Sequence, residues 1–243
     1  MSSVYQKRFY RDWFSNTNLV FFDVCVYESD LMIGACKNMS DEALASVRKY
    51  RQQLKNYIEE DPIFKDSLLP IDVKENAPLI VKIMGEAAKK ACVGPMAAVA
   101  GAIAEMVGKD LLTQSEEVIV ENGGDIFLKT KTPRKIGIYA GESPLSGKIA
   151  LTINPEDTPL GICTSSGTVG HSLSFGKADA AVIISKDTPL ADAAATALGN
   201  KVKMPSDIKA AIEFAQKIEG VEGILVIIGD KMGAWGNIKL TGV

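Results

Sequence analysis

Four short segments of this 243-residue chain carry residue types that could do chemistry. The first is Gly94 and Pro95, which open an expected helix over 95–108. The unpaired N–H groups at a helix N-terminus point outward and favour an anion such as a phosphate. The alternative interpretation is an ordinary helix start packed in the core.

The second segment is a glycine turn placed directly after a strongly apolar strand. Its residues are Glu121, Asn122, Gly123, Gly124 and Asp125. Two glycines permit positive φ and let the backbone approach a ligand closely. A strand that ends in acidic and amide side chains presents these groups to a pocket, although a simple hairpin turn with Asn and Asp as turn residues is the alternative.

The third segment alternates hydroxyl side chains with glycines and contains the only histidine. It includes Thr164, Ser165, Ser166, Gly167 and His171. Such a loop can surround phosphates with N–H and O–H donors, although it lacks the Gly-Lys-Ser/Thr ending of a Walker A loop and the spacing of a GxSxG elbow. A surface loop is the alternative. The histidine is either structural or the general acid/base of the chain near neutral pH.

The fourth segment is an alanine-rich helix start that carries one acid and one hydroxyl. Asp192 and Thr196 are four residues apart, so both project from one face of the helix. A carboxylate and a hydroxyl are hard oxygen ligands suited to Mg²⁺ or Ca²⁺. The alternative is an aspartate that interacts with the helix dipole. We expect the glycine pair, the serine-threonine segment and Asp192 to meet around one cavity that can hold a pyrophosphate.

Strands and helices that could position these segments follow from apolar periodicity and from caps. Runs of strands separated by runs of helices predict an α+β fold with largely antiparallel sheets. The expected strands cover 18–27, 31–36, 118–121, 126–128, 136–140, 148–153, 161–164, 180–185, 223–228 and 238–240. Three expected helices start at Asn76, Pro95 and Thr188, and two others are expected to be capped by Ser40 and Ser206. Residues 61–75 are expected to form a loop.

Composition narrows the class of protein. The net charge is −3, with 47% hydrophobic and 23% charged residues, which is typical of an ordered globular protein without a general attraction to nucleic acid or membranes. The N-terminus is polar and the longest apolar run, 93–104, is shorter than the roughly 20 residues of a membrane span. We therefore expect a cytoplasmic protein that forms a single domain over 1–243, with a loose similarity of layout between its halves.

The cysteines do not indicate a zinc site, because no CxxC pair exists and only one histidine is present. The four are Cys25, Cys36, Cys92 and Cys163, each in apolar sequence surroundings. We expect all of them to be buried thiols in a reducing compartment.

The segments, in this order, resemble the FAD:protein FMN transferase family, the ApbE-like superfamily. The run from Gly94 through VIVENGGDI is similar to the family's helix and strand that end in Asn-Gly-Gly-Asp/Asn. The segment from Thr164 to Gly167 is similar to its Thr-Ser-Gly loop. The segment from Ala191 to Ala197 is similar to its Ala-Asp-Ala-x-x-Thr-Ala signature. The similarity covers roughly Gly94 to Asn200. The family's Asp-Pro element after the Thr-Ser-Gly loop is absent here, and its Lys-Gly is replaced by Val93 and Gly94. The chain looks like an uncharacterised prokaryotic branch of this superfamily.

The resemblance implies a duplicated T-fold-type architecture with helices packed on one face of the sheets, and a flavin nucleotide, FAD or FMN, bound between the halves. It implies that Asp192 and Thr196 hold a divalent cation, that Asn122 to Asp125 line the flavin site, and that Thr164 to Gly167 contact the nucleotide. Members move FMN from FAD onto a protein threonine or serine, so a flavinylated acceptor protein is an expected partner.

Three functions remain open at this point. The first is an enzyme that cleaves the FAD diphosphate, or transfers FMN from it, with Mg²⁺ and with His171 as acid/base. Alternatively, the chain is a non-catalytic module that binds a flavin or another phosphorylated ligand, which the absent Asp-Pro element favours. The third is an oligomeric protein whose glycine turns are only structural. Flat apolar edge strands are compatible with a homodimer, although the sequence does not determine the oligomeric state.

Overall fold

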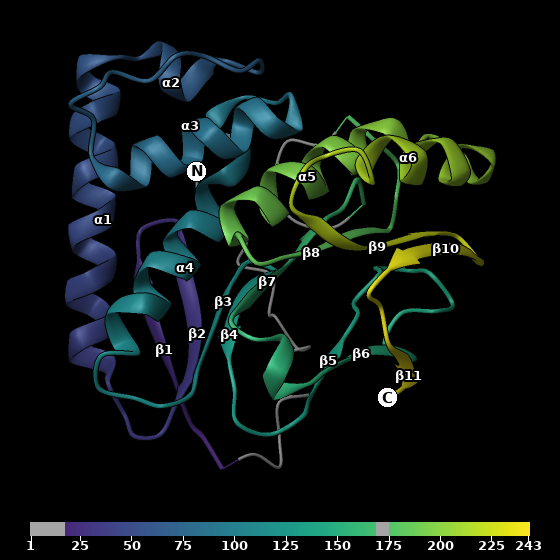
Figure 1. Ribbon diagram of the computed structural model, residues 1–243, viewed down its shortest axis with the longest axis horizontal. Helices are drawn as coiled ribbons and strands as arrows, with labels where there is room; N and C mark the ends of the chain where they lie inside the picture. The colour runs from purple at the N-terminus through teal and green to yellow at the C-terminus, as the bar shows by residue number, and fades with distance from the viewer. Residues whose placement is uncertain (1–17, 169–174) are drawn as a thin grey trace.

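The computed structural model describes residues 18–168 and 175–243 (Figure 1). Its strands are β1 (Val20–Val26), β2 (Ser29–Ala35), β3 (Val118–Asn122), β4 (Asp125–Lys129), β5 (Arg134–Gly137), β6 (Ile149–Ile153), β7 (Leu160–Ser165), β8 (Ala180–Ser185), β9 (Val221–Ile228), β10 (Lys231–Gly236) and β11 (Leu240–Gly242). Its helices are α1 (Ser40–Glu60), α2 (Ile63–Asp66), α3 (Leu79–Ala91), α4 (Val99–Leu111), α5 (Thr188–Lys201) and α6 (Ile208–Ala215). Short 3₁₀ turns are η2 (Pro95–Ala98), η3 (Pro155–Asp157) and η4 (Pro205–Asp207).

Two antiparallel sheets organise the chain. The larger has the strand order β1-β2-β3-β4-β7-β8-β9-β10, and the smaller has the order β11-β6-β5. Each half of the large sheet consists of two hairpins with helices between them along the chain: β1 and β2 precede β3 and β4, while β7 and β8 precede β9 and β10. The halves join where β4 pairs with β7, with Ile126 opposite Ile162. The expected single domain with two similar halves, and a duplication behind them, stay predictions.

The large sheet separates two apolar cores because its side chains alternate between its faces. Phe127, Cys163 and Ile183 belong to the core under α1, α3, α4, α5 and α6. Leu128, Ile162 and Ile184, which are their neighbours in sequence, pack against β5 and β6 of the small sheet. Figure 1 shows the helices on one side of the large sheet and the small sheet on the other. The predicted α+β fold with antiparallel sheets and helices on one face is confirmed.

Several local predictions were wrong. Strand β10 was missed because residues 229–233 were expected to form a turn, yet Lys231–Gly236 pairs with β9 along its whole length. The expected loop over 61–75 contains α2. Neither Ser40 nor Ser206 caps a helix: α1 starts at Ser40 itself without a side-chain cap, and Ser206 lies within the η4 turn before α6. The predicted helix over 95–108 is divided into η2 and α4.

The cysteine prediction was also wrong for three of the four thiols. Only Cys163 is buried, in β7. Cys25 lies on the outward face of the edge strand β1, Cys36 follows the end of β2, and Cys92 ends α3 in a left-handed conformation with φ of 56°. Apolar neighbours in sequence do not bury a residue that points away from the sheet or ends a helix.

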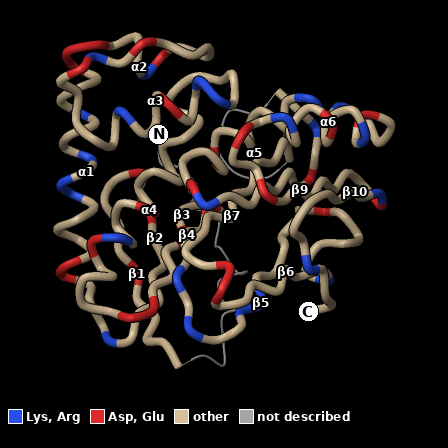
Figure 2. The backbone as a smooth tube through the Cα atoms, viewed as in Figure 1, with Lys and Arg blue, Asp and Glu red and all other residues tan. Residues whose placement is uncertain are grey.

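The charge distribution and the lengths of the apolar helices can be compared with what the composition indicated. Figure 2 shows that α1 carries acidic residues at both ends and basic residues in its middle, so the two signs are mixed along this helix. In the described ranges 18–168 and 175–243, no single helix is long and apolar enough to cross a membrane. The helical segments Leu79–Ala91 and Pro95–Leu111 meet the length and composition criteria only when joined, and they are bent by 105° at the break between them.

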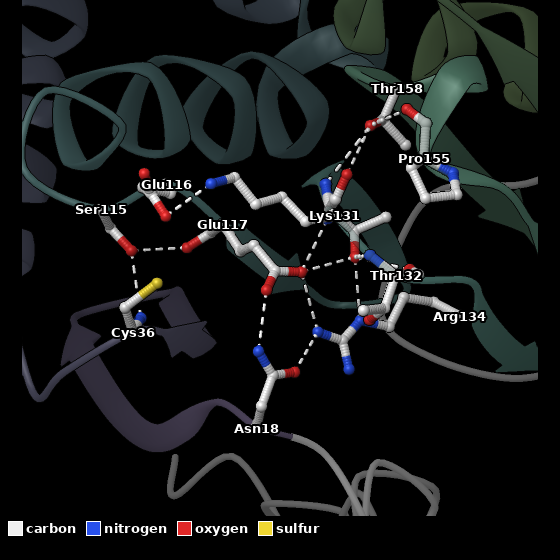
Figure 3. A network of polar contacts seen from close by, with 11 residues as sticks. Asn18, Cys36, Ser115, Glu116, Glu117, Lys131, Thr132, Arg134, Pro155 and Thr158 are labelled. Atoms are coloured by element: carbon white, nitrogen blue, oxygen red, sulfur yellow. Dashed lines mark hydrogen bonds and ion pairs between the residues drawn. The ribbon is translucent and has the colours of Figure 1, made fainter.

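A buried ion pair connects the large sheet to the small one (Figure 3). The Arg134 guanidinium donates to Glu117 Oε2 at 2.9 Å, and the two side chains are 8% and 4% exposed. Glu117 also accepts from Asn18 Nδ2 and from Thr130 Oγ1, each at 2.8 Å, and from Lys131 N at 2.8 Å. Burial alone would raise the pKa of Glu117, but these donors lower it to about 2. The network therefore holds an ionised carboxylate between β3 and β5.

We expect this carboxylate to contribute to an acid transition. A pKa of about 2 in the folded state, below the ordinary value near 4.5, gives stability that is present above pH 4.5 and is lost as the pH falls toward 2, about 3 kcal/mol in all. Urea unfolding between pH 2 and 6 should show this loss in the wild type and not in Glu117→Gln, since other carboxylates contribute equally to both. Parallel free-energy curves for the two proteins would contradict the prediction.

Candidate functional site

The glycine turn between β3 and β4 lies beside the end of β7. Asp125 Oδ1 accepts a hydrogen bond from Thr164 N at 3.2 Å. Inside the turn, Glu121 Oε1 accepts from Gly124 N at 2.7 Å, and both glycines have positive φ, 72° for Gly123 and 100° for Gly124. The turn therefore needs glycine for its backbone, and it brings the second and third predicted segments into contact.

The first turn of α4 receives side chains from two other elements. Asp192 Oδ2 of α5 accepts from Gly101 N at 2.8 Å, in buried surroundings. Asn122 Nδ2, at the end of β3, donates to Ala100 O at 3.1 Å. The acid of the fourth predicted segment and the amide of the second therefore meet at the same helix start, where N–H groups favour negative charge.

Asp125 and Asp192 form a buried acidic pair. Burial raises the pKa of Asp192 to about 7, although bonds with the backbone of Gly101 and Ala100 act in the opposite direction. Burial also raises the pKa of Asp125 well above its usual range, and the nearby charge of Asp192 raises it further. Cys163 lies beside both, and burial together with the two carboxylates raises the pKa of its thiol. Negative charge at this point is thus costly without a cation.

This donor set suits a hard divalent cation. Two buried carboxylates are oxygen ligands of the kind that Mg²⁺ and Ca²⁺ prefer, and a cation would remove the repulsion between them. Thr196 lies one turn after Asp192 on α5 and is half-buried. In the part of the chain that the structure describes, no group of three or more His, Cys, Asp or Glu side chains could hold a metal. The remaining ligands would be hydroxyl, backbone or phosphate oxygens and water.

The rest of the third segment packs against the end of α5 and the segment after residue 174. Gly167 N donates to Ala178 O at 2.9 Å. A Cβ on Gly167 would lie 2.2 Å from Gly176 O, and one on Gly176 would lie 1.9 Å from Gly199 O. Ser165 is buried near Gly199, while Ser166 Oγ accepts from Thr168 N. Close packing explains these glycines, and their predicted contact with a nucleotide stays a prediction.

Two predicted residues lie apart from this arrangement or outside the described ranges. Gly94 is packed against the backbone of Ser67 and Leu68, since a Cβ there would lie 1.9 Å from Ser67 O. Pro95 is buried and begins the four-residue η2 turn. This close approach accounts for Gly94 without an anion, and the anion-binding role of the two stays a prediction. His171 lies outside the described residues.

Sequence reasoning missed the residues of α4 and β7 that complete the site. Gly101 and Glu105 read as part of a buried apolar helix, and Cys163 reads as an ordinary strand residue. The usable signal was a glycine and an acid inside an apolar helical run, since each costs stability there and needs a packing or bonding reason. Their partners on α5 depend on tertiary contacts and cannot be inferred from spacing.

Comparison with known proteins gives a consistent group of relatives. A family model described as "AbpE bacteria" matches residues 11–234. A UPF0280 protein of Methanocella arvoryzae is 46% identical over 196 residues, which cover 80% of each chain. The UPF0280 protein MJ1526 of Methanocaldococcus jannaschii is 45% identical over 79% of this chain and 80% of its own.

A solved structure shares the fold. The apo form of the flavinyl transferase ApbE from Pseudomonas stutzeri superposes with a TM-score of 0.58 and 13% sequence identity, covering 89% of this chain and 94% of the other. Identity at this level supports similarity of fold alone, including the α+β arrangement of helices and antiparallel sheets.

Proposed function

The chain belongs to the AbpE bacteria family, and from this premise we propose that it binds a flavin nucleotide, FAD or FMN, and acts with Mg²⁺ on the FAD diphosphate, by FMN transfer or by cleavage. The observation that carries the proposal is the meeting of Asn122 and Asp192 at the start of α4, with Asp125 bonded to Thr164 N and within reach of the charge of Asp192. A diphosphate needs a cation and N–H donors together. The shared fold with a flavinyl transferase supports a flavin as the nucleotide.

Each segment has a separate proposed task. Asp192 and Thr196 would hold the cation, and Asp125, which lies near enough to feel the charge of Asp192, would supply a second carboxylate. When bound, Mg²⁺ (or Ca²⁺) polarises the phosphoryl oxygen at the bond that breaks. Thr164, Ser165, Ser166 and Gly167 contact the nucleotide.

The turn and the remaining residues line the flavin. Glu121 orders the turn by accepting from Gly124 N, which leaves the exposed Gly123 backbone open to a ligand. Gly94 and Pro95 stay candidates for a phosphate contact, and His171 stays the candidate acid/base.

Incubation of the pure protein with FAD and Mg²⁺ tests the reaction. We expect release of AMP or FMN, detected by liquid chromatography, and its loss on chelation of the metal and in Asp192→Ala. The structure supplies a matched control in Asp187→Asn, because Asp187 caps the same helix from outside the site and asparagine caps equally well. Release that is absent with every divalent metal, or unchanged in Asp192→Ala, would refute the enzymatic proposal.

A non-catalytic flavin-binding module is the second candidate, favoured by the absent Asp-Pro element. It predicts a flavin that copurifies in stoichiometric amount and is recovered unchanged after incubation with Mg²⁺. The absorbance spectrum of the purified protein, followed by mass spectrometry of the denatured supernatant, separates this function from turnover. An acceptor protein with a flavinylated threonine or serine belongs only to the first candidate.

Location and assembly are proposed on general grounds. The chain is proposed to work in the cytoplasm, without nucleic acid or a membrane as partner. Its large sheet ends at β1 and β10, and a groove of about 630 Å³ between α6 and β10 is lined in part by Ile208, Ile212, Met232 and Trp235. An edge strand beside an apolar groove supports a homodimer.

A further inference from the structure

Two hydrogen bonds tie α4 to α5 at matching intervals. Gly101 N donates to Asp192 Oδ2 at 2.8 Å, and Thr188 N donates to Glu105 Oε2 at 2.8 Å. On each helix the two residues are four positions apart, so they lie one turn above each other on one face. In one bond α4 supplies the N–H donor and α5 the carboxylate, and in the other bond these roles are exchanged. Together they fix both the distance and the axial register of the two helices.

Glu105 is an unusual residue in the middle of a buried helix. Its side chain is 9% exposed, and a buried carboxylate is costly unless its oxygens are paired. Oε1 accepts from Lys109 Nζ at 2.6 Å, while Oε2 faces inward to Thr188 N. The ammonium of Lys109 is more than half exposed, so the ion pair stabilises little by itself. The hydrogen bond from Thr188 N of α5 is the contact that satisfies the buried oxygen of Glu105.

The start of α5 depends on Glu105 for one of its donors. Asp187 Oδ1 accepts from Leu190 N at 3.0 Å within the same segment. Pro189 has no N–H to satisfy. Thr188 N is therefore the remaining backbone donor of the first three residues, and its acceptor comes from α4. Asp187 therefore caps α5 from within the same segment, whereas Glu105 connects α5 to α4.

Glycines hold this contact at short range. A Cβ on Gly101 would lie 2.6 Å from Thr188 O and 2.8 Å from Asp192 Cβ. On the opposite side, a Cβ on Gly161 of β7 would lie 2.6 Å from Thr188 Cα. The first turn of α5 is thus seated between α4 and β7 with little room to slide. A shift of this turn would move Asp192 away from both Gly101 N and Asp125.

We propose that Glu105 is a positioning residue for Asp192: by holding Thr188 N it fixes the register of α5 and so keeps the Asp192 carboxylate on Gly101 N and facing Asp125. Its importance for ligand binding rests on the proposed function, in which Asp192 holds the cation. The positioning itself is a property of the ligand-free chain and can be measured without FAD or metal.

Hydrogen exchange of single amides, followed by NMR, tests the positioning. In Glu105→Ala we expect the Thr188 amide to lose protection, and the Gly101 amide to lose at least ~10-fold as well because Asp192 is displaced. Asp187→Ala is the matched control, since it removes a cap from the same turn but leaves the contact with α4. It should expose the Leu190 amide and leave Gly101 within about twofold of the wild type. Glu105→Gln, which retains an acceptor oxygen, should restore Gly101 protection.

The outcomes are distinct. Loss of protection confined to Thr188 in Glu105→Ala would overturn the proposal, because Glu105 would then be only a cap. The proposal would also be overturned if the Gly101 amide were as weakly protected from exchange in Glu105→Gln as in Glu105→Ala. If Glu105→Ala yields no folded protein, Glu105→Asp takes its place and the same criteria apply. The aspartate side chain keeps the charge, but it is shorter by one methylene and loses the hydrogen bond from Thr188 N.

A ligand readout separates this proposal from the proposed function. Titration with FAD by flavin fluorescence, with and without Mg²⁺, should show a weaker Mg²⁺-dependent affinity in Glu105→Ala by at least ~10-fold, with FAD affinity in the absence of metal within about twofold. A wild-type chain that binds no FAD would defeat the proposed function, while the Gly101 amide would still decide the positioning role of Glu105. Equal loss with and without Mg²⁺ would count against positioning through Asp192.

Discussion

Replacing Arg134 with methionine should lower the free energy of unfolding by about 3–5 kcal/mol, the largest stability effect that we expect in this chain. The reason is not the loss of an attraction but the charge left behind. Glu117 would stay buried, 4% exposed at its side chain, with its ionised form no longer matched by a cation. Asn18 would lose the bond from Arg134 to its Oδ1 at 2.7 Å, and Thr130 would lose a second bond from the same guanidinium.

A double-mutant cycle distinguishes this mechanism from simple loss of packing. Arg134→Met with Glu117→Gln should recover much of the loss at pH 7, because an amide can still accept from Thr130 and Lys131 and carries no charge to desolvate. Urea unfolding of the four proteins gives the coupling free energy. Lys131→Met is the control, since its ion pair with Glu116 is exposed and should change stability by at most about 1 kcal/mol. Additive losses from the two buried positions would contradict the charge-based explanation.

The predictable part of the fold was the part specified by local patterns. Apolar alternation located β7, β8 and β9, and the polar ends of β3 and β7 indicated correctly that Asp125 and Thr164 would lie near each other. Strand β10 was missed because Gly229 and Gly233 suit a turn over 229–233, and only the pairing of Lys231–Gly236 with β9 identifies a strand. The exposed Cys25 was also mispredicted, because it points to the face of β1 opposite Phe22 and Val24, which pack in the core under the helices.

The sequence indicated Asn122, Asp125, Thr164 and Asp192 as candidates, but it missed Gly101, Glu105 and Cys163 and the contacts that join the two groups. Asp192 was recognised as an acid on an alanine-rich helix, but its bond to Gly101 joins positions 91 residues apart. Glu105 carried a comparable signal, a charged residue within an apolar helix, and its partner Thr188 is 83 residues away. Such pairs depend on the register of two helices, which no spacing within either helix determines.

Asp192→Asn should separate stability from function in a single substitution. In the ligand-free chain, burial raises the pKa of the Asp192 carboxylate to about 7. Burial also raises the pKa of Asp125, and the charge of Asp192 raises it further. Asparagine keeps an acceptor oxygen for Gly101 N and removes this repulsion, so the variant should be more stable than the wild type at pH 8 by about 1–2 kcal/mol. The same change removes an anionic ligand of the proposed cation, so Mg²⁺-dependent release of AMP or FMN should fall by at least ~100-fold.

Thermal unfolding at pH 8 and a turnover assay with FAD and Mg²⁺ measure the two effects on the same preparations. Asp187→Asn is the matched control because it changes an acid on the same helix that caps Leu190 N and does not face Asp125; its turnover should stay within about twofold of the wild type. A stabilised, inactive Asp192→Asn protein means that the chain accepts a buried repulsion in order to hold a cation, the exchange of stability for function expected at a binding site. A destabilised variant with unchanged turnover would mean the opposite, that Asp192 serves only the start of α4.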